Sequence, residues 1–186
     1  MKIIFLKFKC VLTSVAILFV TASTLCAQPS DLAILFKKLK TLDAVDAPAL
    51  ETKILLEWSK SGSAAIDYLF TLAQIAMDVQ DYDAALLHLN ALTDHAPEFA
   101  EGWSLSAVAL YKLGKTGPAL TAIGHTLALE PRHFRALEGL MFILEDAGLF
   151  VGAFEIFQMI EAIHPHAEIL STARVRLNAK IQGQAL

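Results

Sequence analysis

The chain has 186 residues, 55% of them hydrophobic, and its 15 basic and 19 acidic residues give a formal net charge of −4. This length suits one domain, and a mildly acidic surface disfavours nucleic acid and anionic lipid as partners. Both cysteines, Cys10 and Cys26, fall within the first 27 residues, so the rest of the chain holds no disulfide and no thiolate metal site.

The first 27 residues have the order of a secretory signal peptide. Three lysines and no acid precede a mostly apolar run at 11–20, and small residues end the segment. We expect cleavage after Ala27, or after Ala22 as an alternative, and export to the periplasm, where a chain without thiols suits the oxidising conditions. The other reading is an uncleaved anchor, because residues 10–27 have about the minimum length that spans a bilayer. The membrane is a partner only in that case.

Residues 28–62 follow as a predicted pair of helices. Apolar side chains recur at helical spacing over 31–42, and Pro48 opens the second helix, since proline is tolerated in a first turn. The period described next would place Lys38 and Glu51 at positions that take small or apolar residues. We therefore interpret the pair as a lid, with a degenerate repeat as the alternative.

A period of 34 residues organises the segment that follows. We predict three units, 66–99, 100–133 and 134–167, each with two helical patterns joined by a turn. A fixed period of this length is typical of stacked helix–turn–helix units, which bury their apolar faces against one another. The recurring residues are the prolines Pro97, Pro131 and Pro165 and the alanines Ala85, Ala119 and Ala153.

A last helix is predicted at 168–182, where apolar side chains recur at helical spacing from Leu170 to Ile181. Stacked repeats need their ends covered, and this helix would cap the C-terminal end. With the three units it completes a repeat domain at 63–182.

These columns resemble the tetratricopeptide repeat (TPR), whose consensus has a small residue at the eighth position and alanine at the twentieth. The eighth positions are Ala73, Ala107 and, as a departure, Met141. The two helices of a unit cross where these positions meet, and only small side chains allow that approach. The resemblance implies an all-α fold, a right-handed α-α superhelix of three repeats with an N-terminal lid and a C-terminal capping helix. The layout also resembles that of small exported bacterial TPR proteins.

In TPR stacks the first helix of each unit lines a concave groove. By resemblance, the groove of this chain includes Phe70, Gln74, Ser104, Val108, Tyr111, Arg135 and Phe142. The four apolar or aromatic ones would form a strip in a largely acidic frame, which fits a peptide with apolar anchors and some basic residues. The alternative is that the strip packs against the N-terminal pair or the last helix. The family's carboxylate clamp is not expected, because its asparagine positions hold Thr71, Leu105 and Gly139.

No motif for covalent chemistry or phosphate binding occurs, so we predict no catalytic residue, no cofactor and no small-molecule substrate. Four histidines fall in the turns between units, and we interpret them as solvated because no third ligand is spaced to complete a metal site. The alternative is metal capture or pH sensing. The four are His95, His133, His164 and His166.

The sequence therefore predicts a scaffold without enzymatic activity that is exported to the periplasm. It would bind a peptide or protein segment in its groove, as an assembly or adaptor factor. Two alternatives stay open. One is a membrane-anchored tether of an inner-membrane complex, and the other is a metal- or pH-responsive protein that uses the turn histidines.

Overall fold

The computed structural model describes residues 31–41 and 44–184, and the predicted signal peptide at 1–27 lies outside them. The described residues contain helices and no strand. No helix among them is both long enough and apolar enough to cross a bilayer. In chain order the helices are α2 (Asp31–Thr41), α3 (Ala47–Trp58), α4 (Ala64–Asp78), α5 (Tyr82–His95), α6 (Ala100–Lys112), α7 (Thr116–Leu129), α8 (Phe134–Asp146), α9 (Phe150–Ile163) and α10 (Glu168–Gln184).

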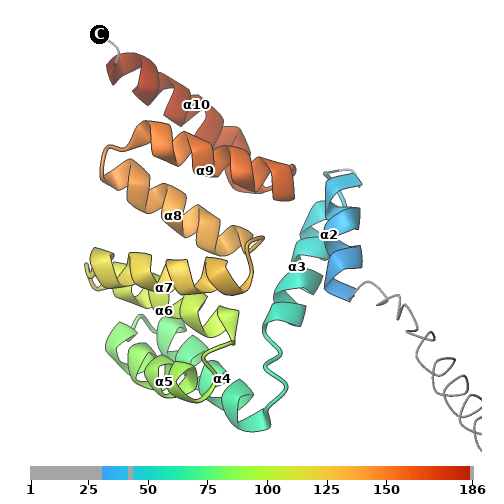
Figure 1. The fold of residues 1–186 in the computed structure, drawn as a ribbon, viewed down its shortest axis with the longest axis vertical. Helices are drawn as coiled ribbons and strands as arrows, with labels where there is room; N and C mark the ends of the chain where they lie inside the picture. The colour runs from blue at the N-terminus through green and yellow to red at the C-terminus, as the bar shows by residue number, and fades with distance from the viewer. Residues whose placement is uncertain (1–30, 42–43, 185–186) are drawn as a thin grey trace, which may run out of the picture. The chain divides into compact units, whose positions relative to one another are not determined.

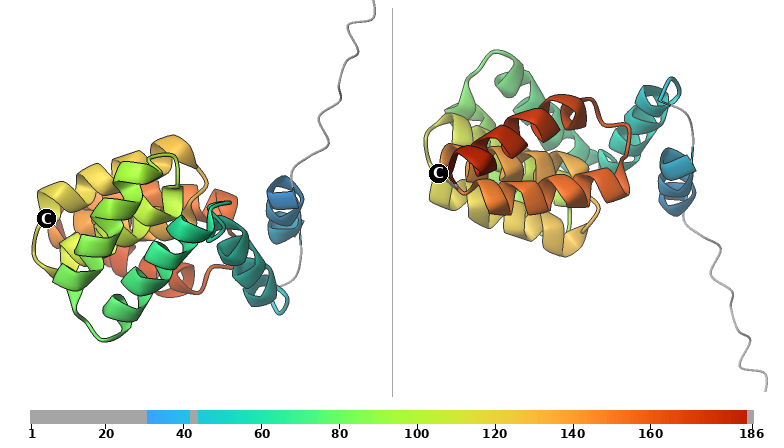
Figure 2. Two further views of the ribbon diagram at one scale, coloured as in Figure 1. Left: turned by 90° about the horizontal axis from the view of Figure 1, so that it is seen from below. Right: turned by 90° about the horizontal axis from the view of Figure 1, so that it is seen from above.

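Three helical pairs, α4–α5, α6–α7 and α8–α9, lie on one another in chain order, and α10 covers the last of them (Figure 1). Helix α5 packs on α6, α7 packs on α8, and α9 packs on α10. Figure 2 shows the same stack from below and from above. The arrangement is an α-α superhelix of helical repeats, in which each pair buries its apolar faces against its neighbours.

Small side chains lie where the two helices of each pair cross. Met141 replaces alanine at the third crossing and is also fully buried, in one core cluster with Phe157 and Leu177. An unbranched thioether adapts to an irregular gap, so this crossing accommodates it. The five alanines of the predicted crossing positions are at most 5% exposed: Ala73, Ala85, Ala107, Ala119 and Ala153.

A residue in the left-handed backbone region closes the turn inside each pair. Gly114 and Gly148 have φ of 73°, and Gln80, at the matching position of the first pair, has φ of 60°. Glycine adopts this conformation without steric cost, whereas a side chain with a Cβ is strained there. Between pairs, a proline lies two residues after the end of each second helix, at Pro97, Pro131 and Pro165.

The N-terminal pair α2–α3 lies beside the stack, next to the turns that precede α8 and α10, and does not pack on α4 (Figure 1). Its apolar cluster takes in Phe134, the first residue of α8, and reaches Ile163 at the end of α9. Trp58, the last residue of α3, stacks on the ring of His133 with ring centroids 4.2 Å apart. The pair therefore covers one edge of the stack and is not a further layer of it.

Candidate functional site

A cavity of about 430 Å³ lies between α6 and α8, the first helices of the second and third pairs. Residues four apart share one face of a helix, which is why Ser104 and Val108 line it from α6 and Glu138 and Phe142 line it from α8. Of the seven predicted groove residues, five line this cavity: Ser104, Val108, Tyr111, Arg135 and Phe142.

The middle of the cavity is apolar and open. Val108 and Phe142 are 43% and 44% exposed, while Ala107 and Ile143 of the same lining are buried. No residue of α2, α3 or α10 lines the cavity, so these two side chains are not covered by the N-terminal pair or by the last helix. Large apolar side chains that stay in contact with water inside a concavity are the usual mark of a binding surface.

At one end of the cavity, Tyr111 of α6 donates a hydrogen bond from its hydroxyl group to the carboxylate of Asp146 on α8. This bond raises the pKa of Tyr111, because the carboxylate holds the phenolic proton. The bond also ties the two walls of the cavity together near the ends of both helices. Lys112 lines the same end and is exposed.

At the other end, Arg135 reaches out of the repeats to α3, where its Nη2 lies 2.6 Å from Oε1 of Glu51. Glu138 lines the cavity one turn further along α8 and is half-buried. Among the described residues, no hydrogen bond or salt bridge reaches its carboxylate. Burial raises the pKa of Glu138, while Arg135 opposes that rise and the carboxylate of Glu51 adds to it.

The other two predicted groove residues lie outside this cavity. Gln74 is exposed on α4, whereas Phe70 is only 4% exposed. The ring of Phe70 meets Phe99 edge-on, with ring centroids 5.5 Å apart, in a cluster with Ile66 and Leu92. The expected strip from Phe70 to Phe142 is therefore wrong at its first member, because Phe99, just before α6, covers that ring.

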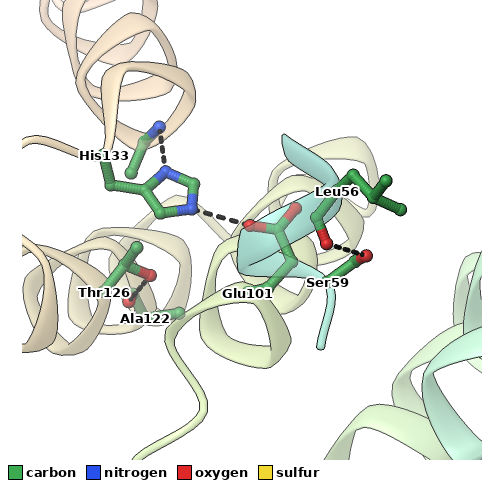
Figure 3. A network of polar contacts seen from close by, with 7 residues as sticks. Leu56, Ser59, Glu101, Ala122, Thr126 and His133 are labelled. Carbon is green, nitrogen blue, oxygen red and sulfur yellow. Dashed lines mark hydrogen bonds and ion pairs between the residues drawn. The ribbon is translucent and has the colours of Figure 1, made fainter. Parts of the chain in front are cut away.

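His133 is fully buried, so its interpretation as a solvated turn residue is wrong. Its Nδ1 accepts a hydrogen bond from the backbone N–H of Ala136 at 3.2 Å and caps α8. Its Nε2 lies 2.7 Å from Oε2 of Glu101 on α6 (Figure 3). Because Nδ1 is an acceptor, Nε2 carries the proton and donates to Glu101. The ring thus joins the start of α8 to α6, with Trp58 stacked on it.

His164 is 1% exposed, so the same interpretation is wrong for it, whereas His95 and His166 are exposed as predicted. The Nε2 of His164 lies 3.4 Å from Oε2 of Glu51, and its ring meets Phe134 edge-on at a centroid distance of 5.3 Å. Burial lowers the pKa of His164, and the hydrogen bond that its ring donates to the carboxylate of Glu51 opposes this. No three His, Cys, Asp or Glu side chains within 31–41 and 44–184 are placed to hold a metal ion.

The contacts of Glu51 are not predicted from the sequence: one carboxylate oxygen accepts a hydrogen bond from Arg135, and the other lies 3.4 Å from the Nε2 of His164. Both partners lie far later in the chain, so no local sequence pattern indicates the contact. The sequence does indicate that Glu51 faces inward. Glu51 precedes Ile54 and Trp58 by three and seven residues, which places it on their face of α3, the side that packs inward.

Comparison with known proteins supports the repeat assignment. No family model matches the chain. A TPR repeat-containing protein of Rhizobium etli is 36% identical over 115 residues, which are 61% of this chain and 56% of that protein. This chain therefore spans little more than half the length of that relative.

Among solved structures, the TPR2B domain of yeast Sti1 in its complex with pHsp70 is similar, with a TM-score of 0.57 and 21% identity. The match covers 66% of this chain and 99% of that domain, and at this identity it shows the fold alone. The chain is therefore similar in sequence to a tetratricopeptide-repeat protein over 115 residues, and its stacked helical pairs have the fold of a tetratricopeptide-repeat domain.

Proposed function

We propose that this protein is an exported, non-enzymatic scaffold that binds a peptide or protein segment in the cavity between α6 and α8. It would act as an assembly or adaptor factor in the periplasm. One observation carries the proposal. Residues from two successive repeats converge on one cavity whose apolar centre, Val108 and Phe142, stays more than two-fifths exposed. A water-exposed apolar centre between polar ends suits a segment with an apolar anchor.

The walls of this cavity are held before any partner arrives. Tyr111 bonds across it to Asp146 at one end, and Arg135 is fixed by Glu51 at the other. A preformed site loses little conformational freedom on binding, so more of the contact energy contributes to affinity. The mechanism is therefore equilibrium recognition, without a covalent step.

Partner recognition by a fold of this kind is supported by the TPR2B domain of yeast Sti1, which forms a complex with pHsp70. Its partner is not carried over to this chain. The positions where the family's carboxylate clamp has asparagine hold Thr71, Leu105 and Gly139 here, so a different recognition chemistry is expected.

A crosslinking experiment in cells tests the binding surface. A photoreactive amino acid is placed at Phe142, and the matched control places it at Met159 on α9, which is 46% exposed against 44% for Phe142. We expect a discrete adduct from position 142 and none from position 159. We also expect Phe142→Glu to abolish partner capture while Met159→Glu retains it. Equal adducts from both positions, or none from either, would refute this surface.

Export rests on the sequence of residues 1–27, which lie outside the described part of the chain. Mass measurement of the protein recovered from its native host tests it. Loss of about 27 residues supports a cleavable signal peptide. An uncut chain in the membrane fraction would favour the membrane-anchored tether instead.

The burial of two turn histidines favours a second candidate function, a response to pH. His164 faces Glu51 of α3 and is nearly inaccessible to water. Protonation of a buried imidazole is unfavourable, so acid conditions would weaken the packing of the N-terminal pair against the repeats. Urea unfolding of wild type and His164→Gln at pH 7.5 and 5.5 tests this response.

A further inference from the structure

Among the charged residues that line the cavity, Glu138 is the one that is partly buried, while Lys112, Arg135 and Asp146 are exposed. Glu138 is half-buried in the wall of α8, and no hydrogen bond or salt bridge from the described residues reaches its carboxylate. Arg135 lies three residues earlier on the same helix, but it gives its guanidinium to Glu51 at 2.6 Å. A partly buried carboxylate without a hydrogen-bonding partner is unfavourable. A cation supplied by a ligand would remove that penalty.

The opposite charge at the far end of the cavity is weaker as a recognition element. Lys112 is exposed, so water and salt screen its interaction with any acidic group of a partner. Glu138 is partly withdrawn from water, where the same pairing is screened less. The raised pKa of Glu138 agrees with this withdrawal, since burial is its main cause. Electrostatic selection in the cavity therefore favours a basic partner group at the Glu138 end.

The spacing of Glu138 and Phe142 sets where that basic group stands relative to the apolar anchor. The two residues are one turn apart on α8, which is about 6 Å along the helix axis. In an extended peptide, side chains two residues apart point to the same side and are separated by about 6.6 Å. The two spacings match, so a basic residue and an apolar residue with one residue between them can reach both positions.

We propose that the occupant of this cavity is an extended peptide segment with lysine or arginine two residues from an apolar side chain. The cation pairs with Glu138, and the apolar side chain lies between Val108 and Phe142. This inference rests on the proposed function, because it assumes that the cavity binds a peptide. It adds the charge and the spacing of the partner.

Selection from a phage-displayed library of random peptides against the full chain tests the proposed function and the Glu138 subsite separately. We expect enriched peptides that bind wild type, fail to bind Phe142→Glu, and share a basic residue two positions from an apolar one. Enriched peptides that need Phe142 but lack a basic residue would overturn the Glu138 subsite and leave the proposed function standing. Absence of any peptide that depends on Phe142 would overturn both.

A double-mutant cycle with a selected peptide locates the cation. Glu138→Gln is expected to weaken binding roughly tenfold to a hundredfold, the usual value of a bond to a charged group. Glu155→Gln, on an exposed position of α9, is the matched control and should leave affinity unchanged. Replacing the basic residue of the peptide by norleucine should remove the difference between wild type and Glu138→Gln. Additive losses would refute the contact. Thermal melting separates binding from folding, since Glu138→Gln should not lower the melting temperature.

Discussion

Substitution of Ala119 by leucine tests the central packing claim of the fold. Ala119 lies on α7 with no exposed surface, in a cluster with Ala107 and Ile123. Three added carbon atoms have no free space at this crossing, so the helices must separate or the side chain must take a strained rotamer. Overpacking of this kind costs about 1–3 kcal/mol. For a domain of this size, 1 kcal/mol lowers the melting temperature by about 2–4 °C.

The matched control is Ala128→Leu, which makes the same change at an exposed position of the same helix. There the substitution stays within about 0.5 kcal/mol of wild type, as surface changes generally do. Urea unfolding followed by circular dichroism measures both free energies. We expect Ala119→Leu to be less stable than Ala128→Leu by at least about 0.5 kcal/mol. Equal stabilities would show that Ala119 does not lie at a tight crossing.

Two further predictions concern stability. Because burial lowers the pKa of His164, the folded state binds its proton less readily than the unfolded state, so this group reduces stability as pH falls below about 6.5. Urea unfolding at pH 7.5 and 5.5 should therefore show a larger loss for wild type than for His164→Gln, and equal losses would contradict the assignment. Gly114→Gln, at φ of 73° and in open space, should cost about 1 kcal/mol. Gln80→Gly, at the matching turn, should stabilise the protein relative to wild type by part of that amount, because it removes the strained side chain. Thermal melts in which Gly114→Gln is not less stable than wild type, or Gln80→Gly is not more stable, would refute the strain argument.

The repeat architecture could be predicted because its determinants are local and recur. Small residues such as Ala85 and Ala153 mark the crossings by their phase alone, and prolines mark the ends of the second helices. The cavity could be predicted in part for the same reason. Helices α6 and α8 occupy equivalent places in successive repeats, so equal repeat positions put Val108 and Phe142 on neighbouring faces.

In the first repeat, the same reasoning predicted a groove residue wrongly. Phe70 holds the same repeat position as Ser104 and Glu138, yet its ring is buried against Phe99. A repeat position fixes the direction of a side chain relative to its own helix, but not which neighbour covers it. Large aromatic side chains gain by burial wherever a partner ring lies within reach, and here the partner precedes the next repeat.

The position at which the N-terminal pair packs on the repeats could not be predicted either, because its contacts join segments that are far apart in the chain. Arg135 and Glu51 are 84 positions apart, and His164 and Glu51 are 113 apart. Histidine in a turn is ordinarily solvated, but here Trp58 stacks on the ring of His133 and Phe134 lies edge-on to the ring of His164. Burial of this kind is a property of the assembled fold and leaves no periodic signal in the sequence.

Glu51 connects this edge of the stack to the cavity. The residue breaks the repeat pattern because a carboxylate faces inward on α3, and that carboxylate holds Arg135 at 2.6 Å. Arg135 and Glu138 are three residues apart on one helix, a spacing at which opposite charges ordinarily pair. By engaging Arg135, Glu51 leaves Glu138 without a cation in hydrogen-bonding contact and adds its own negative charge nearby. The charge that the cavity presents to a partner therefore depends on the N-terminal pair, although no residue of that pair lines the cavity.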